Sequence, residues 1–485
     1  MNNSEERRDA TASVEPSPSE SPGRGRSRRR RLWIVLASVI AVALIVGGII
    51  LVTQPPAPPF QQSWSRTLAG NPFGSGAAAD GAYLAFSSTS TRSLVPPYPL
   101  NASVSMQSIN ASTGRSEWSS SPIVLLGDIS VQPEILVGAS FAALVVTSAT
   151  LTSGNLTVLV ANLSTGATLG TWTEPLPEWS AILPPNVQVG LANSTLVTVV
   201  PLDLNASLPV RIQGIDVVSG AVDWATSTNL SGDVGWGTGS VRVLVSGSNV
   251  VCILAPSGGV DDGGEILVLS GENGALRFER DIPGSSDPIG GVLDLDAFFY
   301  LSNSSGEIAI QGNELTDGAN TTSIGVPSVA DDALLSAQLY SVGPLLILAS
   351  YSPSLSYAAY AANGSLAWTV NFPYATSCGS TVEFPELGPC ATALESPLAY
   401  NNDAEVLLSS GPFLLSPGTT YHNAYRMVSL SQGNIEWSRD YLYTFGETWP
   451  WSSPVPSFTV TSVVGSEVIF TVQTPDSTVL GGGVL

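Results

Sequence analysis

Apolar and polar residues repeat one short pattern six times between residues 109 and 437. Each copy has an apolar stretch, a small polar pair, a glycine, and a second apolar stretch that ends in an aromatic residue. Glycine supplies the positive φ that a tight turn requires, so the pattern predicts a β-hairpin. In five copies the glycine precedes the aromatic residue by four positions: Gly114/Trp118, Gly220/Trp224, Gly274/Phe278, Gly364/Trp368 and Gly433/Trp437. In the sixth, Gly166/Trp172, it precedes it by six.

The spacing of the hairpins predicts the architecture. The first four glycines are 52, 54 and 54 residues apart, a period typical of one four-stranded propeller blade. A degenerate unit is expected at 290–325. Three strand-like runs follow the last hairpin, and a lone strand with Trp64 precedes the first, so the two ends together predict an eighth blade that closes the ring. We expect an all-β fold, an eight-bladed β-propeller, with seven blades or an unrelated β-sandwich as the alternatives.

The glycines and aromatic residues of the repeat are expected to be structural. A blade cannot bury its own apolar face, so each repeated aromatic residue should pack against a neighbouring unit. Four tryptophans are expected to be buried against a neighbouring blade: Trp118, Trp224, Trp368 and Trp437.

The repeated phrase, as in VANLSTGATLGTW and IDVVSGAVDW, resembles the tryptophan repeat of the PQQ-like (quinoprotein alcohol dehydrogenase-like) β-propeller family. The resemblance covers residues 60 to 485, although only Asp216 matches the family's usual aspartate. It implies a fold shared by quinone-dependent dehydrogenases and by an outer-membrane assembly lipoprotein that binds no quinone. The quinone enzymes use a vicinal cysteine pair and an aspartate base beside calcium. This sequence has neither, so we expect no catalytic residues, no cofactor and no metal.

Residues 32 to 52 are 21 consecutive uncharged, overwhelmingly apolar residues, enough for a helix that spans a bilayer core of ~30 Å. Six arginines lie in residues 24–31, which predicts that the N-terminus stays inside and that everything after residue 53 is outside. A cleaved signal peptide is the alternative, but the apolar run is long for one. The predicted organisation is a disordered basic tail (1–31), a single transmembrane helix (32–53), a proline-rich stalk (54–62) and the propeller (63–485).

Charge and composition favour an exported ectodomain in the cell membrane. Beyond residue 53 the chain has nine arginines against 34 acidic residues, and it has no lysine. An acidic surface of this kind argues against a nucleic-acid partner, because phosphates would be repelled. Ten asparagines in this part begin Asn-x-Ser/Thr sequons and are candidate glycosylation sites: Asn101, Asn110, Asn155, Asn162, Asn193, Asn205, Asn229, Asn303, Asn320 and Asn363.

The chain has three cysteines. Cys378 and Cys390 close a short loop within an insertion, and in an oxidising compartment they are expected to form a disulfide. Cys252 lies in an apolar strand and is expected to be a buried apolar residue.

Few residues are available for acid–base or metal chemistry. The single histidine, His422, is expected in a polar surface loop. Asp261, Asp262 and Glu265 lie in a glycine-rich stretch that offers oxygen ligands for calcium, with a solvated turn as the simpler interpretation. Two further acidic pairs, Asp294/Asp296 and Asp331/Asp332, are expected to lie on separate turns.

Two classes of function follow from these observations. The first is a non-catalytic, membrane-anchored propeller that presents loops to a protein or glycan partner or takes part in envelope assembly. The second is a degenerate PQQ-dependent-type dehydrogenase, or another enzyme, that uses the central funnel. Convergence of carboxylates and aromatic residues at the funnel would favour the second. The loops expected to bind are residues 374–396 and 412–426 and the aromatic stretch 441–451.

Overall fold

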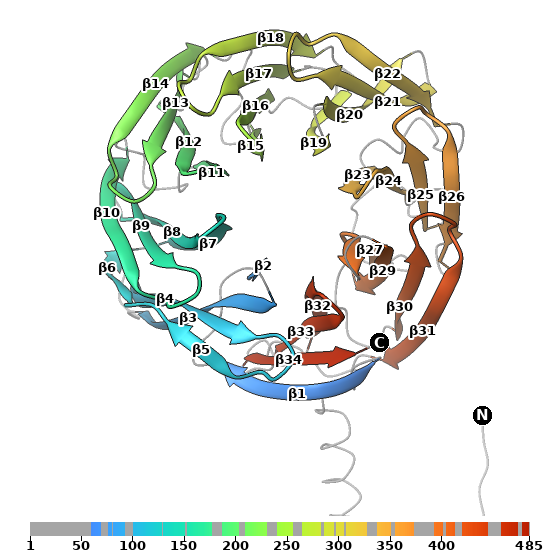
Figure 1. Ribbon diagram of the computed structural model, residues 1–485, viewed down its shortest axis with the longest axis horizontal. Coiled ribbons are helices and arrows are strands. Elements are labelled where there is room, and N and C mark those ends of the chain that lie inside the picture. Colours follow the sequence, from blue (N-terminus) through green and yellow to red (C-terminus); the bar gives the residue numbers. More distant parts are fainter. Residues whose placement is uncertain are drawn as a thin grey trace, which may run out of the picture. The chain divides into compact units, whose positions relative to one another are not determined.

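The described part of the chain forms a closed ring of eight antiparallel β-sheets, the blades of a propeller (Figure 1). It is a computed structural model, and all described residues belong to one compact unit, Pro55–Leu485. The structure describes residues 60–484 apart from 69–75, 80, 93–99, 129, 151–152, 177–186, 203–208, 230–239, 256–263, 283–285, 295–296, 305–306, 327–336, 351–354, 373–391, 401–403, 413–419, 445–456 and 474–477.

The first four blades follow one another along the chain, each running from an inner to an outer strand. Blade 1 contains β2 (Ala77–Ala79), β3 (Ala82–Arg92), β4 (Leu100–Asn110) and β5 (Ser116–Ser119), with β6 (Ile123–Asp128) as a second outer partner of β4. Blade 2 contains β7 (Ser130–Val137), β8 (Phe141–Ala149), β9 (Gly154–Asn162) and β10 (Thr168–Leu176). Blade 3 contains β11 (Gln188–Ala192), β12 (Thr195–Pro201), β13 (Pro209–Asp216) and β14 (Val222–Asn229). Blade 4 contains β15 (Ser240–Ser246), β16 (Asn249–Ala255), β17 (Gly264–Ser270) and β18 (Leu276–Ile282).

The remaining blades complete the ring. Blade 5 contains β19 (Ser286–Asp294), β20 (Ala297–Ser304), β21 (Glu307–Glu314) and β22 (Asn320–Gly325). Blade 6 contains β23 (Ala337–Val342), β24 (Leu345–Ser350), β25 (Ser356–Ala361) and β26 (Leu366–Asn371). Blade 7 contains β27 (Thr392–Leu394), β28 (Leu398–Tyr400), β29 (Glu405–Pro412), β30 (Thr420–Ser429) and β31 (Ile435–Thr444). Blade 8 combines β32 (Ser457–Val464), β33 (Glu467–Gln473) and β34 (Thr478–Val484) with β1 (Gln61–Leu68).

Blade 8 confirms the predicted closure by the two ends of the chain. Strand β1 pairs with β34 along its length, with Trp64 opposite Gly482 and Leu68 opposite Thr478. The chain enters the ring slightly earlier than predicted, since β1 begins at Gln61 and the preceding Phe60 is already buried. The last two residues of the expected stalk are therefore part of the propeller. The eight-bladed alternative is the correct one, and the seven-bladed one is wrong.

The repeated aromatic residue joins each blade to the next. The indole N–H of Trp118 in blade 1 donates to the carbonyl oxygen of Leu163 in blade 2, at 2.8 Å. The ring of Trp118 also lies against Gly166, where an added Cβ would come within 2.7 Å of it. The same bond recurs from Trp64 to Ala111 (2.6 Å), from Trp172 to Val217 (2.9 Å), from Trp224 to Gly271 (3.0 Å) and from Trp368 to Leu430 (3.2 Å). The predicted burial is confirmed for Trp118, Trp224 and Trp368.

The prediction that Trp437 is buried is wrong, because its side chain is only half-buried. The other tryptophans cover the hairpin between the last two strands of the following blade. Blade 8, which follows Trp437, has no such hairpin, since its last two strands are β34 and β1 from opposite ends of the chain. Trp437 lies opposite Met427 and packs at the margin of the cluster between blades 7 and 8. Trp64 and Trp172 are also half-buried, although each covers such a hairpin.

Phe278 also departs from the pattern of the buried tryptophans, since it too is half-buried. It keeps the expected neighbour, because an added Cβ on Gly318, the turn glycine of blade 5, would lie 2.9 Å from its ring. A phenyl ring is smaller than an indole and has no N–H to donate, so only the packing half of the contact remains. Phe278 accordingly lies at the edge of the cluster formed by Val268 and Leu315.

Two copies depart from the repeat in sequence. In blade 2 the position after the bulge, where other copies have the aromatic residue, is Gly170, and a Cβ there would lie 2.0 Å from the carbonyl oxygen of Val218. Trp172 lies two residues further along β10, and its ring still lies against the Gly220 turn of blade 3. In the degenerate blade 5, Thr322 stands four residues after the turn glycine in place of an aromatic residue. Its hydroxyl donates to the carbonyl oxygen of Ala362 at 3.2 Å, which keeps the polar half of the contact.

The core lies mainly between the faces of neighbouring blades. One buried cluster joins blades 1 and 2 through Trp118, Leu125 and Leu144, and another joins blades 3 and 4 through Trp224, Val243 and Cys252. The predicted segments before the ring, namely the tail (1–31), the helix (32–53) and most of the stalk (54–62), lie outside the described residues. Within the described ranges, no helix is long and apolar enough to cross a membrane.

Candidate functional site

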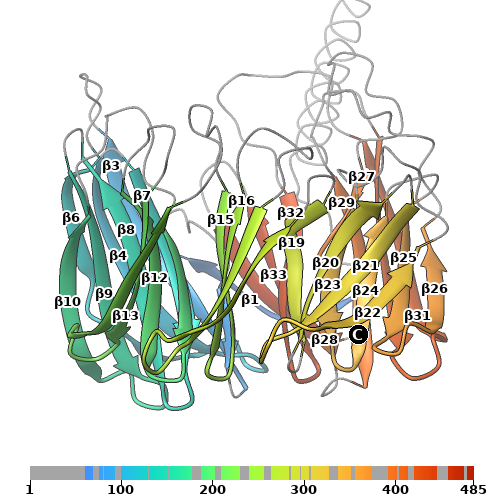
Figure 2. The same cartoon turned by 90° about the horizontal axis from the view of Figure 1, so that it is seen from above.

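The two ends of the ring differ in how the strands are connected (Figure 2). Because the strands of each blade are antiparallel, the glycine hairpins and the short turns between the first two strands of each blade lie at one end. We call this the hairpin end. The connections between the middle strands, and those from each blade to the next, lie at the opposite, loop end. The connections 373–391 and 445–456 start and end at strand ends on the loop end, and their own residues lie outside the described part of the chain.

The expected binding loops are partly strands. Residues 420–429 form β30, which pairs with β31 up to Thr444, so about half of the expected loop 412–426 and the start of the aromatic stretch 441–451 are regular sheet. His422 lies on β30 opposite Leu442, so the expectation that it lies in a loop is wrong, while its predicted exposure lies outside what the structure describes. Pairing with the long outer strand β31 overrides the polar local sequence there. Likewise, Thr392–Leu394 of the expected insertion 374–396 forms β27.

Polar residues meet where the innermost strands of three blades approach the ring axis. Arg242 comes from β15, Gln338 and Tyr340 come from β23, and Glu395 and Ser396 follow β27. We call these five residues the inner-strand cluster. The Tyr340 hydroxyl donates to Gln338 Oε1 and also bonds the Ser396 side chain. Arg242 Nη1 donates to the carbonyl oxygen of Gly291 on β19 at 2.9 Å, which extends the guanidinium toward blade 6.

A β-bulge places Glu395 in this cluster. Leu394 lies opposite Ser410 and Leu398 opposite Leu407, so three residues of the inner strand face two residues of β29. An extra residue of this kind redirects a side chain. The carboxylate of Glu395 accepts a hydrogen bond from Ser409 Oγ at 2.7 Å, and its other oxygen lies over Gly411, where a Cβ would approach to 2.1 Å. Glycine at 411 thus makes room for the carboxylate.

Burial gives this cluster its electrostatic character. Desolvation raises the pKa of Glu395, and the hydrogen bond from Ser409 opposes that shift. Desolvation is also the largest cause of the raised pKa of Tyr340, which the hydrogen bond to Ser396 and the charge of Arg242 lower and the charge of Glu395 raises. Glu134 on β7 is accessible to solvent, yet the surrounding protein desolvates its carboxyl and raises its pKa. The raised pKa means that each of these groups holds its proton to a higher pH than the same group does in water.

A second acidic group lies in blade 4, away from the inner strands. Glu265 on β17 is 8% exposed and lies opposite Asp281 on β18. Its burial, its hydrogen bond to Glu279 and the charges of Glu279 and Asp281 raise the pKa of Glu265 to about 7. Asp261 and Asp262, the other members of the suggested calcium loop, lie outside the described residues. No group of three or more His, Cys, Asp or Glu side chains in the described ranges is arranged to hold a metal ion.

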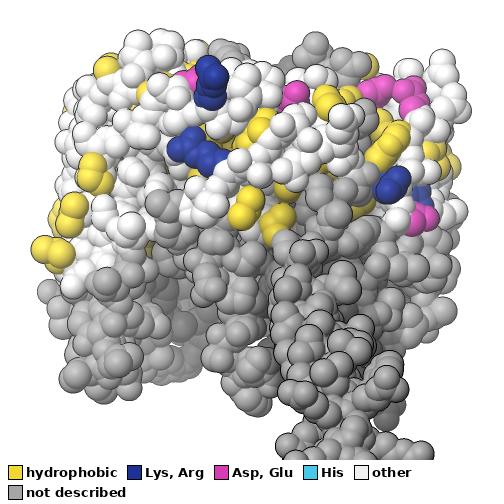
Figure 3. Space-filling view, turned by 90° about the horizontal axis from the view of Figure 1, so that it is seen from below, with side chains coloured by type: hydrophobic (Ala, Val, Ile, Leu, Met, Phe, Trp, Pro, Cys, Tyr) yellow, Lys and Arg dark blue, Asp and Glu magenta, His cyan; other side chains and the backbone are white. Residues whose placement is uncertain are grey.

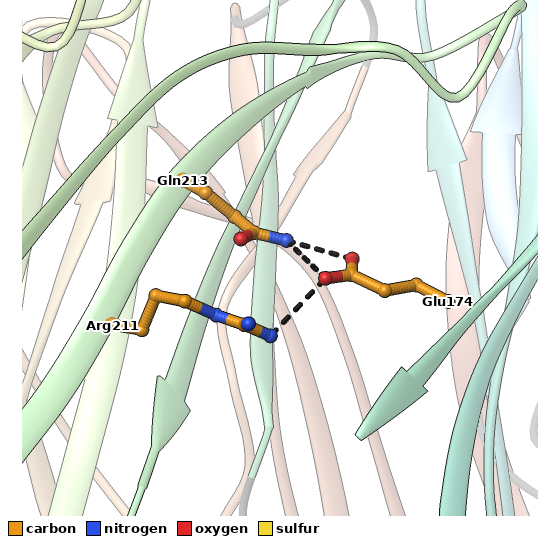
Figure 4. Close-up of polar contacts among 3 residues, drawn as sticks. All are labelled: Glu174, Arg211 and Gln213. Carbon is orange, nitrogen blue, oxygen red and sulfur yellow. Dashed lines mark hydrogen bonds and ion pairs between the residues drawn. The ribbon is translucent and has the colours of Figure 1, made fainter. Parts of the chain in front are cut away.

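Glu174, Arg211 and Gln213 form a group of polar contacts between blades 2 and 3 (Figure 4). Glu174 on β10 receives hydrogen bonds from Arg211 Nη2 at 3.1 Å and from Gln213 Nε2, which is 2.7 Å from each carboxylate oxygen. Arg211 and Gln213 both lie on β13. Both carboxylate oxygens of Glu174 have donors across the blade boundary and Arg211 neutralises its charge, so this group is best explained as structural, although Nε of Arg211 is buried without a hydrogen-bond partner.

The sequons have a second role in the hairpins. Asn110 and Asn162 stand four residues before the turn glycine, the place of Asp216, and each side-chain oxygen accepts backbone and hydroxyl hydrogen bonds from the turn. Asn363 caps its shorter turn similarly. Such Asx contacts stabilise the turn and explain the asparagines structurally. Asn101, Asn193 and Asn320 are exposed, Asn155 is half-buried, the side chains of Asn229 and Asn303 are not described, and Asn205 lies outside the described residues.

The three cysteines lie in different parts of the chain. Cys252 is a free, fully buried thiol on β16, and burial raises its pKa to about 12. Such a thiol is unreactive. Cys378 and Cys390 lie outside the described residues, and their disulfide stays a prediction.

Sequence reasoning missed the inner-strand cluster. The residues belong to the first strand of blades 4, 6 and 7, where nothing resembles a known motif. The spacing of the repeat could have found them, because it identifies the first strand of each blade as the innermost one. Arg242 and Tyr340 are polar residues on two of these strands.

Comparison with known proteins gives similarities of fold only. No family model matches the chain, and no curated protein matches it. Among solved structures, BamB from Moraxella catarrhalis is 14% identical and matches 87% of this chain and 99% of its own, with a TM-score of 0.41. Dihydro-heme d1 dehydrogenase NirN in complex with DHE is 11% identical, over 76% and 66% of the two chains, with a TM-score of 0.41. A europium-containing methanol dehydrogenase is 8% identical, over 87% and 85%, with a TM-score of 0.42.

Proposed function

We propose that this protein is a membrane-anchored propeller, outside the cytoplasm, that binds a protein or glycan partner, in envelope assembly or on the cell surface, through its loop end. The difference between the two ends of the ring is the observation that carries the proposal. At the hairpin end, short turns are fixed by glycines and Asx contacts, whereas at the loop end the connections vary in length from blade to blade. A rigid scaffold that varies its loops on one face is typical of a binding protein.

The anchor and the location belong to the same proposal. The apolar run 32–52 and the arginines before it support one membrane crossing with the N-terminus inside. In intact cells, added protease should leave the N-terminal tail protected and reach an epitope inserted after residue 380. Protection of the epitope together with exposure of the tail would reverse the proposed orientation.

Site-specific photo-cross-linking in native membranes tests the binding face. A cross-linker at residue 383, in the loop 373–391, should capture a partner from the cell envelope. A cross-linker at Ser112, in a turn of the hairpin end, is the matched control and should capture none. Capture of the same partner from Ser112 but not from residue 383 would place binding at the wrong end and contradict the proposal.

A second candidate function rests on the inner-strand cluster. Glu395, Tyr340 and Arg242 bring a carboxyl, a phenol and a guanidinium together at the innermost strands, which favours reversible binding of a small polar ligand there. A panel of sugars and polyols, followed by thermal unfolding, tests it. A ligand that raises the Tm of the wild type but not of Glu395→Gln or Tyr340→Phe would support this function.

The alternative of an enzyme is tested separately. We expect no dye reduction when the purified full chain is incubated with PQQ, calcium and alcohols or aldoses. A base beside the substrate and an electron acceptor are both required for such oxidation. Saturable turnover that calcium chelation abolishes would support the dehydrogenase instead.

A further inference from the structure

Five exposed aliphatic side chains lie at the same place in five blades. Each follows its turn glycine by two or three positions, at the start of the outer strand, and is 45–57% exposed. They are five of the nine exposed large hydrophobic side chains in the described residues. We call them the hairpin-end belt: Leu169, Val222, Leu276, Leu366 and Ile435. Because the glycine turns all lie at the hairpin end, the belt runs round that end of the ring.

The hairpins do not require an apolar residue at this place. Two positions after the turn glycine, blade 1 has Ser116 and blade 5 has Asn320, and both are exposed. Ser116 pairs with Ile109 just as Val222 pairs with Ile215. A single exposed aliphatic residue is ordinary, but one that recurs at a fixed place in five blades indicates a surface that contacts something apolar.

The chain enters the ring at the same end. Gln61, the first residue of β1, pairs with Val484, and Val484 pairs with Glu467 on β33. Glu467 lies two residues after Gly465, the turn glycine between β32 and β33, so all three residues belong to the hairpin end. The segment that precedes Phe60 therefore joins the propeller beside the belt.

The length of that segment limits which end of the ring can face a bilayer, given the membrane anchor of the proposed function, on which this inference depends. Residues 53–59, TQPPAPP, separate the apolar run 32–52 from Phe60. In the polyproline form they reach about 22 Å, part of which crosses the headgroup layer. Strand β4 has 11 residues and runs between the two ends of the ring over about 33 Å. The segment is thus too short for the loop end to face the bilayer.

Charge identifies the kind of surface that the belt meets. The chain has a net charge of −22, which repels a second copy and anionic headgroups but not a zwitterionic headgroup layer. The hairpin turns of blades 2 and 6, at 164–169 and 363–367, include no charged residue. Figure 3 shows that the described surface of the wall on the side of β1 is also mostly uncharged.

We propose that the hairpin-end belt rests on the outer surface of the membrane that anchors the chain, with its aliphatic side chains among zwitterionic lipid headgroups and the loop end directed away. Each side chain contributes little on its own. The short tether keeps the belt close to the lipid, so a weak contact is enough to orient the ring.

Fluorescence quenching by lipid tests this contact. Leu276→Cys and Leu202→Cys, each labelled with a small fluorophore, are reconstituted as full chains in phosphatidylcholine vesicles that contain a lipid with a nitroxide headgroup. Leu276 lies on blade 4, across the ring from the strand β1 that the anchor precedes (Figure 1). Leu202, the matched control, is an exposed leucine that follows β12 at the loop end. The label at residue 276 should lose most of its fluorescence and the label at residue 202 should keep it, with labelled wild type as the background.

The outcomes separate this inference from the anchor. Flotation first shows whether the full chain is held by the vesicles. If the chain floats and the label at residue 202 is quenched instead, or neither label is quenched, the belt does not rest on the bilayer although the anchor holds. A chain that does not float contradicts the anchor, and the belt contact with it.

A second set of variants tests the aliphatic side chains themselves. In the labelled Leu276→Cys chain, Val222→Ser/Leu366→Ser should reduce the quenching at an unchanged Tm, whereas Ser116→Ala, at the same place in blade 1, should not. Phosphatidylglycerol in place of phosphatidylcholine should also reduce it, because Asp223 and Glu436 directly follow belt residues. Undiminished quenching in the double serine variant would show that the belt does not hold this end to the lipid.

Discussion

The indole N–H of Trp118 donates a hydrogen bond of 2.8 Å to the carbonyl oxygen of Leu163, a residue of the following blade. The same ring covers Gly166, the glycine of that blade's hairpin. One repeated sequence phrase therefore supplies both partners of a contact, since the tryptophan of one copy meets the turn of the following copy. This relationship explains why the repeat persists although the intervening loops differ in length: it is the joint between blades.

Replacement of Trp224 measures the strength of that joint. Trp224 is 8% exposed and donates to the carbonyl oxygen of Gly271 at 3.0 Å. Trp224→Ala should lower the free energy of unfolding by about 3–5 kcal/mol, because it leaves a cavity between blades 3 and 4. Trp224→Phe keeps most of the apolar surface and should cost about 0.5–1.5 kcal/mol through the lost hydrogen bond. Chemical denaturation measures both, and equal losses in the two variants would contradict a packing role.

Two glycines of blade 4 separate backbone strain from contact with the indole ring. Gly274 has φ +68°, and a Cβ there would lie 2.4 Å from Trp224. Gly247 has φ +57° and no atom within 4 Å of such a Cβ. Both Gly→Ala changes should carry the left-handed cost of about 1–2 kcal/mol. Gly274→Ala should lose more stability because the ring must also move. Equal Tm values would show that the tryptophan contact is unimportant.

Hairpin periodicity was sufficient to predict the eight blades and the pairing of Trp64 with the C-terminal strands, because each unit repeats a local turn. It could not predict the degree of burial of each aromatic residue, which depends on the neighbouring blade. Trp118, Trp224 and Trp368 are buried, whereas the other repeated aromatic residues are half-buried, including Trp64 and Trp172, which also cover a hairpin of the following blade. In blade 5 the sequence pattern does not predict the contact with blade 6, since Thr322 stands in place of the aromatic residue and makes the hydrogen bond to Ala362 instead.

The inner-strand cluster could not be found from the repeat pattern. Glu395 owes its position to a bulge and to the space above Gly411. Both features depend on pairing between strands that are separate in the sequence, so no local pattern of apolar and polar residues records them.

Glutamine and arginine should contribute unequally to the contact between blades 2 and 3. Gln213 is 3% exposed and bonds both oxygens of Glu174, whereas the side chain of Arg211 is 30% exposed. Gln213→Ala leaves a partly buried carboxylate, whose side chain is 20% exposed, short of donors and should cost about 1–3 kcal/mol. Arg211→Ala should cost about 1 kcal/mol or less because water screens the pair. The free energies of unfolding in denaturant compare them, and a larger loss in Arg211→Ala would reverse this assignment.

Stability should fall as the pH rises through the range set by Glu265. Its pKa is about 7 in the folded protein against an ordinary 4.5, so the folded state holds this proton more tightly. The associated stability is present below pH 4.5, decreases up to about pH 7 and stays low above it. Glu265→Gln should therefore lose this decrease and have the higher Tm at pH 8.

Thermal unfolding across pH 4–9 gives the difference in Tm between wild type and Glu265→Gln at each pH. The other acidic groups are the same in both proteins, so their contribution cancels in this difference. Glu279→Gln should narrow the affected range, because it removes both the hydrogen bond and the charge that help to raise the pKa of Glu265. A difference between wild type and Glu265→Gln that does not change with pH would mean that the pKa of Glu265 is the same in the folded and unfolded states.

Ring closure depends on a run of three glycines in β34. A Cβ on Gly482 would lie 2.3 Å from Nε1 of Trp64, and Cβ atoms on Gly481 and Gly483 would meet Phe470 and Phe60. The glycines therefore admit the aromatic residues that join the N-terminal strand to the C-terminal ones. Gly482→Ala should displace Trp64 and lower the free energy of unfolding by about 1–3 kcal/mol, the usual cost of overpacking.

Gly325, at the end of the outer strand β22 of blade 5, is the matched control for Gly482. It has no atom within 4 Å of an added Cβ, so Gly325→Ala should leave the Tm nearly unchanged. Because β34 is the strand partner of β1 in blade 8, Gly482→Ala should also speed proteolysis near Gln61, whereas Gly325→Ala should not. Limited proteolysis with mass spectrometry measures this opening. If both variants were cut at the wild-type rate, the contact between Trp64 and Gly482 would not hold the ring closed.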